Sequence, residues 1–192
     1  MQQSLSASPS LPQLPVSNAQ LGVVLLIAAE TMLFVGLIGA YLMFRIGSVT
    51  WPSAWLYLPI GMTCLNTLVL LSSSYTMQHA LRAARAQPST TPLRFLTLTA
   101  ALGISFLLVQ GYEWLQLIRD GLTISTGIYG ATFYTLIGCH ALHVLAAVAW
   151  LVVVLFLVHR RRATAEHIVA CGRYWQFVCA LWVVLFALVY LN

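Results

Sequence analysis

Titratable side chains lie inside stretches of this chain that are apolar and long enough to cross a bilayer. His140 and His143 are one helical turn apart in the segment 128–158, which contains no Asp, Glu, Lys or Arg. Three further groups lie in comparable segments: Glu30, Glu113 and His79. A polar group at such depth costs several kcal/mol unless it is paired or neutral. The chemistries to weigh are metal ligation, proton transfer and hydrogen bonding between helices.

The composition indicates a membrane protein. Hydrophobic residues make up 60% of the 192 residues and charged residues only 7%, whereas soluble domains have about 25% charged residues. The net charge of +5 comes from arginines that cluster at the ends of apolar segments. Because no basic stripe with interleaved aromatic residues is present, nucleic acid is not an expected partner.

Five uncharged apolar runs predict an all-α, polytopic bundle of five transmembrane helices. The predicted spans are 20–44, 54–81, 95–118, 129–158 and 174–191. Together they form one predicted domain, residues 20–192. Residues 1–19 are rich in Ser, Pro and Gln and lack the basic start and apolar run of a signal peptide, so we interpret them as a disordered cytoplasmic arm.

The arginines predict the orientation of the bundle. The connections after spans two and four are arginine-rich, with Arg82, Arg85, Arg94, Arg160, Arg161, Arg162 and Arg173. Only Arg45 and Arg119 fall on the other side. Positive charge favours the cytoplasmic side, so the amino terminus is predicted inside and the carboxyl terminus outside.

Depth argues against a metal or haem site within this chain. His79 lies near the inner end of its span and His143 near mid-span, which separates them by over about 10 Å at helical rise. His140 and His143 share one helix and one face, so they cannot be opposite axial ligands of one haem. The four cysteines include no CxxC pair and are interpreted as buried small hydrophobes.

Hydrogen bonding between helices is the simpler interpretation of the two histidines. Glu113 and His140 both fall in the outer half, so a carboxylate–imidazole contact is a hypothesis. Glu30 has no cation at its depth, and three interpretations stay open: a neutral acid bonded to another helix, a carboxylate that meets a partner subunit, or a proton-linked group. Phe34 and Tyr41 lie close to the same helix face as Glu30.

Six ordered segments resemble subunit III of the haem-copper cytochrome c and quinol oxidases, over residues 20–190. The strongest is DGLTISTGIYGATFYTLIGCHALHV at 120–144, which is similar to "DG…YGSTFF…TGFHGLHV" and places His140 and His143 on the two motif histidines. The others are AETMLF at 29–34 ("SE-x-MFF"), WP at 51–52 ("WPP"), LNT at 65–67, QGYEW at 110–114 ("Q-x-x-EY") and RYWQF at 173–177 ("YWHF"). His79 also matches a family histidine.

The resemblance implies a cofactor-free helical partner of catalytic subunit I, with no activity of its own. Haem and copper are expected in partner subunits, and bound phospholipid is allowed. The implied role is to support subunit I in oxygen reduction coupled to proton translocation, through a lipid-filled surface, an oxygen route and sustained proton uptake. Subunit I is the main expected partner, with subunit II and small subunits, in a bacterial plasma membrane. Contact with subunits or lipid is expected at Trp51, Arg173, Tyr174, Trp175 and Gln176.

The chain also departs from the family pattern. The full-length family has seven helices, of which this chain matches the last five, so lipid sites that need the first two are in doubt. Gln176 and Cys179 replace a histidine and an aspartate, and Val169 replaces a frequent glutamate. We expect neutral groups to face Gln176 and Cys179. The alternatives are an accessory protein of quinol oxidation or nitric oxide reduction, and a free-standing haem or metal membrane protein.

Overall fold

The computed structural model describes residues 18–48, 51, 60–85 and 92–191. Five long helices account for nearly all of them: α1 (Asn18–Gly47), α2 (Ile60–Arg85), α3 (Leu93–Arg119), α4 (Ile128–His159) and α5 (Ala165–Tyr190). A short 3₁₀ helix, η1 (Ile124–Thr126), precedes α4. No strand occurs in these ranges. The prediction of an all-α, five-helix protein is therefore confirmed.

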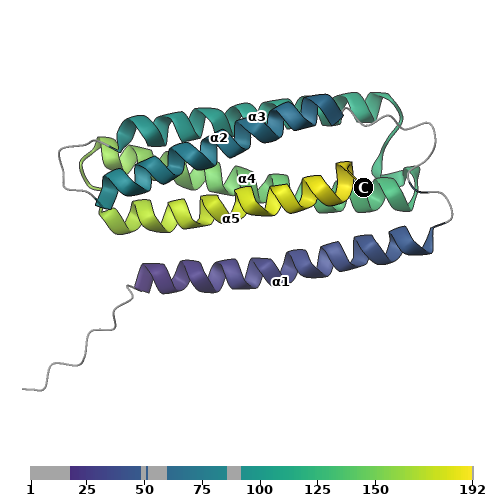
Figure 1. The fold of residues 1–192 in the computed structure, drawn as a ribbon, viewed down its shortest axis with the longest axis horizontal. Helices are drawn as coiled ribbons and strands as arrows, with labels where there is room; N and C mark the ends of the chain where they lie inside the picture. Colours follow the sequence, from purple (N-terminus) through teal and green to yellow (C-terminus); the bar gives the residue numbers. More distant parts are fainter. Residues whose placement is uncertain (1–17, 49–50, 52–59, 86–91, 192) are drawn as a thin grey trace, which may run out of the picture.

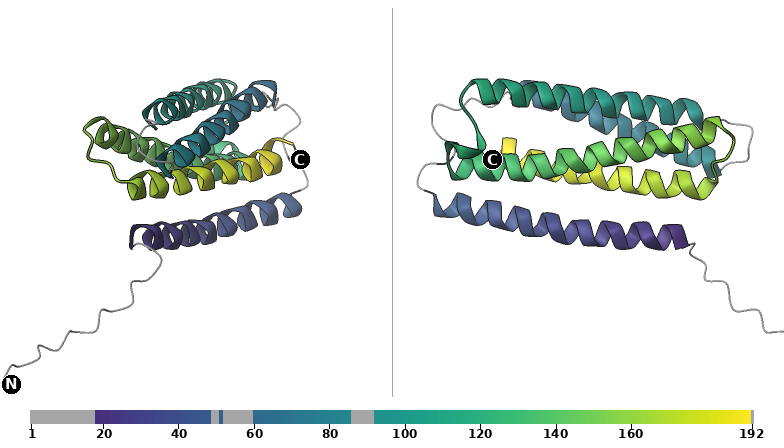
Figure 2. Two further views of the ribbon diagram at one scale, coloured as in Figure 1. Left: turned by 60° about the vertical axis from the view of Figure 1, so that its left-hand side comes forward. Right: turned by 180° about the vertical axis from the view of Figure 1, so that it is seen from behind.

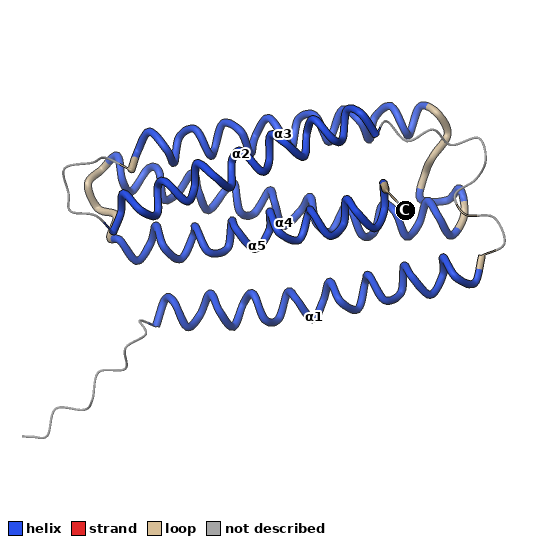
Figure 3. Tube along the Cα trace, viewed as in Figure 1, coloured by secondary structure: helices blue, strands red, loops and turns tan. Residues whose placement is uncertain are grey.

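The helices run alternately up and down along one long axis (Figure 1). Helices α2, α3, α4 and α5 form a closed four-helix ring in which each contacts the next and α5 returns to α2. Helix α1 packs outside this ring, against α4 and α5 (Figure 2). The coloured trace in Figure 3 shows the loop with η1 at the same end of the bundle as the carboxyl terminus.

Four of the described helices, α1, α3, α4 and α5, are long and apolar enough to cross a membrane. Helix α2 has the length but is more polar, because its inner face is built from Thr63, Asn66, Thr67 and Ser73. These side chains are buried, while Leu65, Leu68 and Leu71 of α2 are exposed. The polarity of α2 is thus directed at its neighbours and not at lipid.

Polar side chains join the middle of α2 to α5. The indole N–H of Trp182 donates to Thr67 at 3.0 Å, and that of Trp175 donates to Ser73 at 3.2 Å. Gln176 donates to the carbonyl of Ser74 at 2.8 Å. Indole and amide groups need such partners when they are buried, so these contacts fix the register between the two helices.

The start of α5 differs from the prediction. The helix begins at Ala165, where the backbone N–H of Thr164 donates to His167 Nδ1 at 3.1 Å in a capping arrangement. The predicted start, at residue 174, followed the apolar run and placed Arg173 in a loop. Arg173 instead lies within α5. A long cationic side chain is tolerated there because it can extend from the helix toward the interface.

Helix α1 packs against the ring through one face. Val23, Phe34 and Tyr41 are its buried side chains, and Phe34 and Tyr41 share the face that carries Glu30, as predicted. Its other side chains are mostly exposed. The helix begins at Asn18, so the last two residues of the predicted arm are helical. The rest of the arm, 1–17, lies outside the described residues.

Candidate functional site

Glu30 lies near the middle of α1 and is held there by residues of α4 and α5. Its Oε1 accepts a hydrogen bond from the phenol of Tyr174 on α5 at 3.1 Å. The same oxygen lies 3.8 Å from Nε2 of His143 on α4. Only 13% of the Glu30 side chain and 16% of the His143 side chain are exposed. We call Glu30, His143 and Tyr174 the carboxylate cluster.

One proton decides the charge state of this cluster. The Nδ1 of His143 lies 2.7 Å from the backbone oxygen of Cys139. A carbonyl oxygen can only accept, so Nδ1 carries a proton and the neutral ring leaves Nε2 free to accept. A further proton either stays on Glu30, giving a neutral pair, or moves to Nε2, giving an ion pair. The arrangement places a carboxyl group and an imidazole side by side on two helices.

Glu30 was expected to have no cation at its depth, and the group that lies beside it is His143, which is cationic only when its ring is protonated. Both Glu30 and His143 were placed near mid-span from the sequence, which is the signal that could have paired them. Tyr174 was named only as a contact with a partner subunit or lipid, yet it is 4% exposed and faces Glu30. What the sequence could not supply is the rotation of α1 about its own axis, which turns Glu30 toward α4 and α5.

Glu113 belongs to a second polar group, near the carboxyl-terminal end of α3. The hydroxyl of Thr63 lies 3.2 Å from both carboxylate oxygens, and the amide of Gln110 donates to Oε2 at 3.0 Å. Glu113 is 1% exposed. These bonds join α2 to α3, so Glu113 serves the contact between two neighbouring helices.

The predicted direct contact between Glu113 and His140 was wrong. Neither ring nitrogen of His140 has a hydrogen-bond partner among the described residues. The ring is fully buried and stacks on Trp182 of α5, with centroids 5.2 Å apart and an interplanar angle of 27°. The two groups share a depth but project toward different helices, so His140 contributes packing and not an interhelical hydrogen bond to Glu113.

Two further predicted residues, His79 and Trp51, contact aromatic rings of the same chain. His79 sits between Tyr75 and Phe95, with centroid distances of 4.6 and 5.4 Å. Trp51 bridges Tyr41 and Tyr129, at 5.4 and 5.0 Å. These ring contacts tie α2 to α3 at one end of the bundle, and α1 to α4 at the other.

Two of the predicted subunit or lipid contacts at the start of the last span, Trp175 and Gln176, contact α2 of the same chain. Trp175 is 1% exposed, and Gln176 bonds Ser74 of the same chain. The Sγ of Cys179 faces the carbonyl of Leu70 at 4.0 Å. Within the chain, the groups that face Gln176 and Cys179 are neutral and belong to α2, and the expectation of a neutral partner surface stays a prediction. Arg173 is partly exposed.

The histidines and cysteines were considered as metal ligands, and their positions in the structure show whether they come together. His140 points to α5 and His143 to α1, although both contact the ring of Phe34. Among the described residues, no three His, Cys, Asp or Glu side chains gather closely enough to hold a metal ion. The four cysteines are free thiols. The polar chemistry of this bundle therefore centres on the carboxylate cluster.

Comparison with known proteins gives a consistent assignment. The family model described as cytochrome c oxidase subunit III matches residues 14–192. The cytochrome c oxidase subunit 3 of Corynebacterium diphtheriae is 34% identical over 88% of this chain and 85% of its own length. That of Synechocystis is 37% identical over 88% and 74%, and that of Bacillus subtilis is 29% identical over 98% and 93%.

These matches extend over the same helices that carry the carboxylate cluster and the Glu113 group. The long apolar helices agree with a multi-pass protein of the bacterial plasma membrane. The resemblance found in six short segments is thus confirmed over most of the chain. The chain belongs to the cytochrome c oxidase subunit III family and is subunit III of a haem-copper oxidase.

Proposed function

We propose that this chain is the non-catalytic subunit III of an aa3-type cytochrome c oxidase. In this role it supports catalytic subunit I in oxygen reduction coupled to proton translocation. Subunit I is its main partner, subunit II and small subunits complete the assembly, and the haems and copper reside in those partners. The names of the matched relatives support cytochrome c, and not quinol, as the electron donor of the complex.

The carboxylate cluster is the observation that carries the proton-linked part of this proposal. Oε1 of Glu30 and Nε2 of His143 lie 3.8 Å apart, and Tyr174 donates a hydrogen bond to the same carboxylate oxygen. An ionisable group at this depth is a functional candidate by default, because an apolar side chain would fold at lower cost. Both members of the pair are partly exposed where α1 meets α4.

Helix α1 offers the surface on which a partner would pack. It contacts only α4 and α5 among the described elements, and large apolar side chains cover its other faces, including Met32, Val35, Met43 and Ile46. An apolar groove of about 260 Å³ runs beside it, lined in part by Leu37, Ala40 and Thr135. We infer that subunit I and bound phospholipid cover this side.

The test compares the purified oxidase with a Glu30→Gln variant of this subunit. Gln keeps the size and an acceptor oxygen but cannot exchange a proton, so proton translocation per electron should fall while haem content and initial turnover persist. Glu166→Gln is the matched control, because Glu166 is exposed in the first turn of α5. Unchanged proton stoichiometry in Glu30→Gln would refute the proton-linked role.

The assembly itself is tested by what copurifies with this chain. A large subunit with two a-type haems supports the proposed oxidase type, and another haem complement contradicts it. The isolated chain should show no haem absorbance and no oxygen reduction. Such activity in the isolated chain would favour the free-standing haem protein instead.

A further inference from the structure

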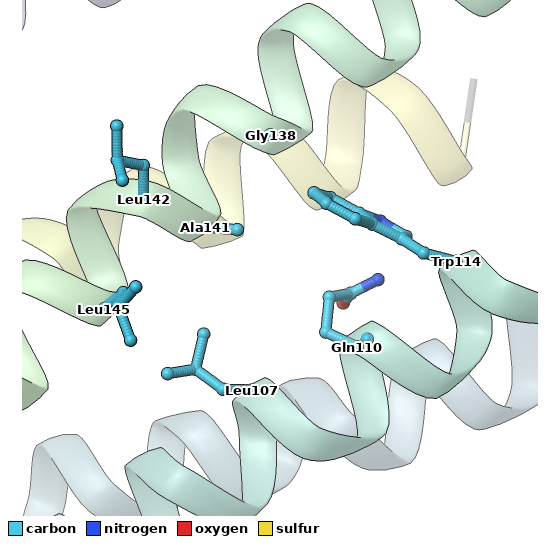
Figure 4. A pocket seen from close by; sticks show the side chains of 8 residues that line it. Leu107, Gln110, Trp114, Gly138, Ala141, Leu142 and Leu145 are labelled. Atoms are coloured by element: carbon cyan, nitrogen blue, oxygen red, sulfur yellow. The ribbon is translucent and has the colours of Figure 1, made fainter. Parts of the chain in front are cut away.

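Two surface grooves of the bundle, each of about 330 Å³, differ in their chemistry. The groove between α3 and α4 is lined by leucines, small residues, Gln110 and Trp114, none of which titrates near neutral pH (Figure 4). The second groove lies where α1 and α5 begin, and its lining includes Glu166 and His167. Histidine is the side chain whose charge changes between about pH 5 and 8. The second groove therefore contains a group that can respond to pH.

The imidazole of His167 caps the start of α5. Its Nδ1 lies 3.1 Å from the backbone nitrogen of Thr164 and 2.7 Å from the hydroxyl oxygen of the same residue. A backbone N–H only donates, so Nδ1 carries no hydrogen and the proton of the neutral ring is on Nε2. The backbone N–H of a capping residue has no acceptor within the helix. The neutral imidazole of His167 supplies that acceptor.

A proton on Nδ1 would remove this acceptor. The imidazolium can still donate to the hydroxyl of Thr164, but its hydrogen bond from the backbone N–H is lost because both groups are then donors. The positive ring also lies in the first turn of α5, where the helix dipole favours negative charge. The intact first turn thus binds fewer protons than the opened one, so it is favoured at higher pH.

The charged groups around His167 act in both directions. Glu166 shares the groove and favours the imidazolium. Arginines at the same end of the bundle oppose it: Arg82 and Arg85 on α2, Arg160, Arg161 and Arg162 before α5, and Arg173 on α5. From α1 and α4 the groove is lined by residues that do not titrate: Ala19, Gly22, Val23, Leu26 and Trp150. Within the groove, His167 is thus the group that changes charge near neutral pH.

The start of α5 also supports the start of α1. The two helices begin at the same end of the bundle (Figure 1). His167 and Ala170 line one side of the groove, and Ala19 and Val23 of α1 line the other. Helix α1 contacts only α4 and α5 among the described elements. Opening of the first turn of α5 would therefore remove part of the surface on which the first turns of α1 pack.

We propose that His167 is a pH switch that controls the starts of α5 and α1. The neutral ring caps α5 and keeps the two helix starts packed together. The protonated ring releases the first turn of α5, and the start of α1 loosens with it. The arginine distribution predicts that this end of the bundle is cytoplasmic, so the switch responds to cytoplasmic pH.

Hydrogen–deuterium exchange of the intact oxidase measures the opening. The informative amides are 168–170, the first with acceptors inside α5, and 22–26 of α1. They are compared at about pH 8 and about pH 5.5, with labelling times scaled to the intrinsic exchange rate at each pH. Protection of both segments should fall at the lower pH. Loss of a helix cap changes the opening equilibrium of α5 about two- to thirtyfold.

Substitutions of His167 separate its proton from its role as an acceptor. His167→Gln keeps an acceptor that does not titrate, because Gln at this position also forms a capping box with Thr164. Its protection should be the same at both pH values, and His167→Glu should behave alike. His167→Ala should give low protection at both. His159→Gln is the matched control, because His159 is exposed at the end of α4 in the same segment and should leave the pH response intact.

The outcomes that would overturn the proposal are distinct. The absence of a pH response in the unmodified oxidase would show that a proton on His167 does not open α5. A full response in His167→Gln would assign the effect to another group. Equal loss of the response in His159→Gln and His167→Gln would show that the cap has no specific role. A response in α5 with α1 unchanged would refute the coupling between the two helix starts.

Discussion

The phenol oxygen of Tyr174 lies 3.1 Å from Oε1 of Glu30, although 144 positions separate the two residues in the chain. This contact links the first described helix to the last. Helix α1 otherwise packs mainly through apolar side chains. The hydrogen bond therefore fixes the rotation of α1 about its own axis, because only one face of the helix carries Glu30. It also restrains one oxygen of the carboxylate that faces His143.

Tyr174→Phe should therefore loosen α1 without unfolding the ring. We expect a loss of about 0.5–2 kcal/mol in unfolding free energy, the range for hydrogen bonds between membrane helices. Denaturant titration of the purified chain in detergent measures it. Tyr75→Phe is the control, since Tyr75 is 63% exposed and its substitution should change stability by less than about 0.5 kcal/mol. Equal losses of unfolding free energy in the two variants would show that the hydrogen bond between Tyr174 and Glu30 does not stabilise α1.

Glycines at helix contacts make a sharper packing test. A Cβ at Gly103 would overlap the ring of Trp175, which is buried and cannot move aside. Gly103→Ala should destabilise the protein by about 1–3 kcal/mol through overpacking. Gly36→Ala on α1 meets nothing within 4 Å, so it should be neutral or stabilise by up to about 1 kcal/mol. Thermal unfolding of both variants checks the contrast.

Thr63→Val tests the group around Glu113. Valine keeps the shape but removes the hydroxyl that bonds both carboxylate oxygens. Because Glu113 stays buried with fewer donors, we expect a loss of about 1–3 kcal/mol. Thr97 bonds only its own helix backbone and is exposed, so Thr97→Val should cost little. A similar loss in both variants would indicate a helix-propensity effect and not the lost bond.

The proposed orientation predicts the outcome of reporter fusions. Alkaline phosphatase fused after Gly121 should be active, because the arginine distribution places the loop between α3 and α4 outside. A fusion after Arg162, in the loop between α4 and α5, should be inactive. A fluorescent protein that folds only in the cytoplasm should give the reverse pattern at the two positions. The opposite results would show that the helices have the reverse orientation in the membrane.

The sequence predicts the helices well because the bilayer permits few alternatives. Backbone groups in lipid must bond within their own segment, so apolar runs translate almost directly into helices such as α4. The start of α5 was not predicted from the apolar run, because it depends on the capping contact between Thr164 and His167, which lie before that run. Arg173, treated as a loop residue, is part of that helix.

Side-chain partners were harder to predict than helices. Depth along a helix follows from residue number, and it placed Glu30 level with His143. Rotation about the helix axis does not follow from residue number, so depth alone also suggested the pair of Glu113 and His140. The structure forms the first contact and not the second, because His140 turns to Trp182 while Glu113 turns to Thr63.

The buried polar face of α2 bears on how the chain is made. This helix is the least apolar of the five, and its hydroxyl and amide groups find partners on α3 and α5. Helix α3 is the next to emerge from the ribosome, whereas α5 is the last. Insertion of α2 as a hairpin with α3 would pair Thr63 and Asn66 early, while the hydroxyls of Thr67 and Ser73 bond carbonyls of their own helix. These two hydroxyls are thus acceptors held ready for the indole N–H groups of α5, the last helix to be made.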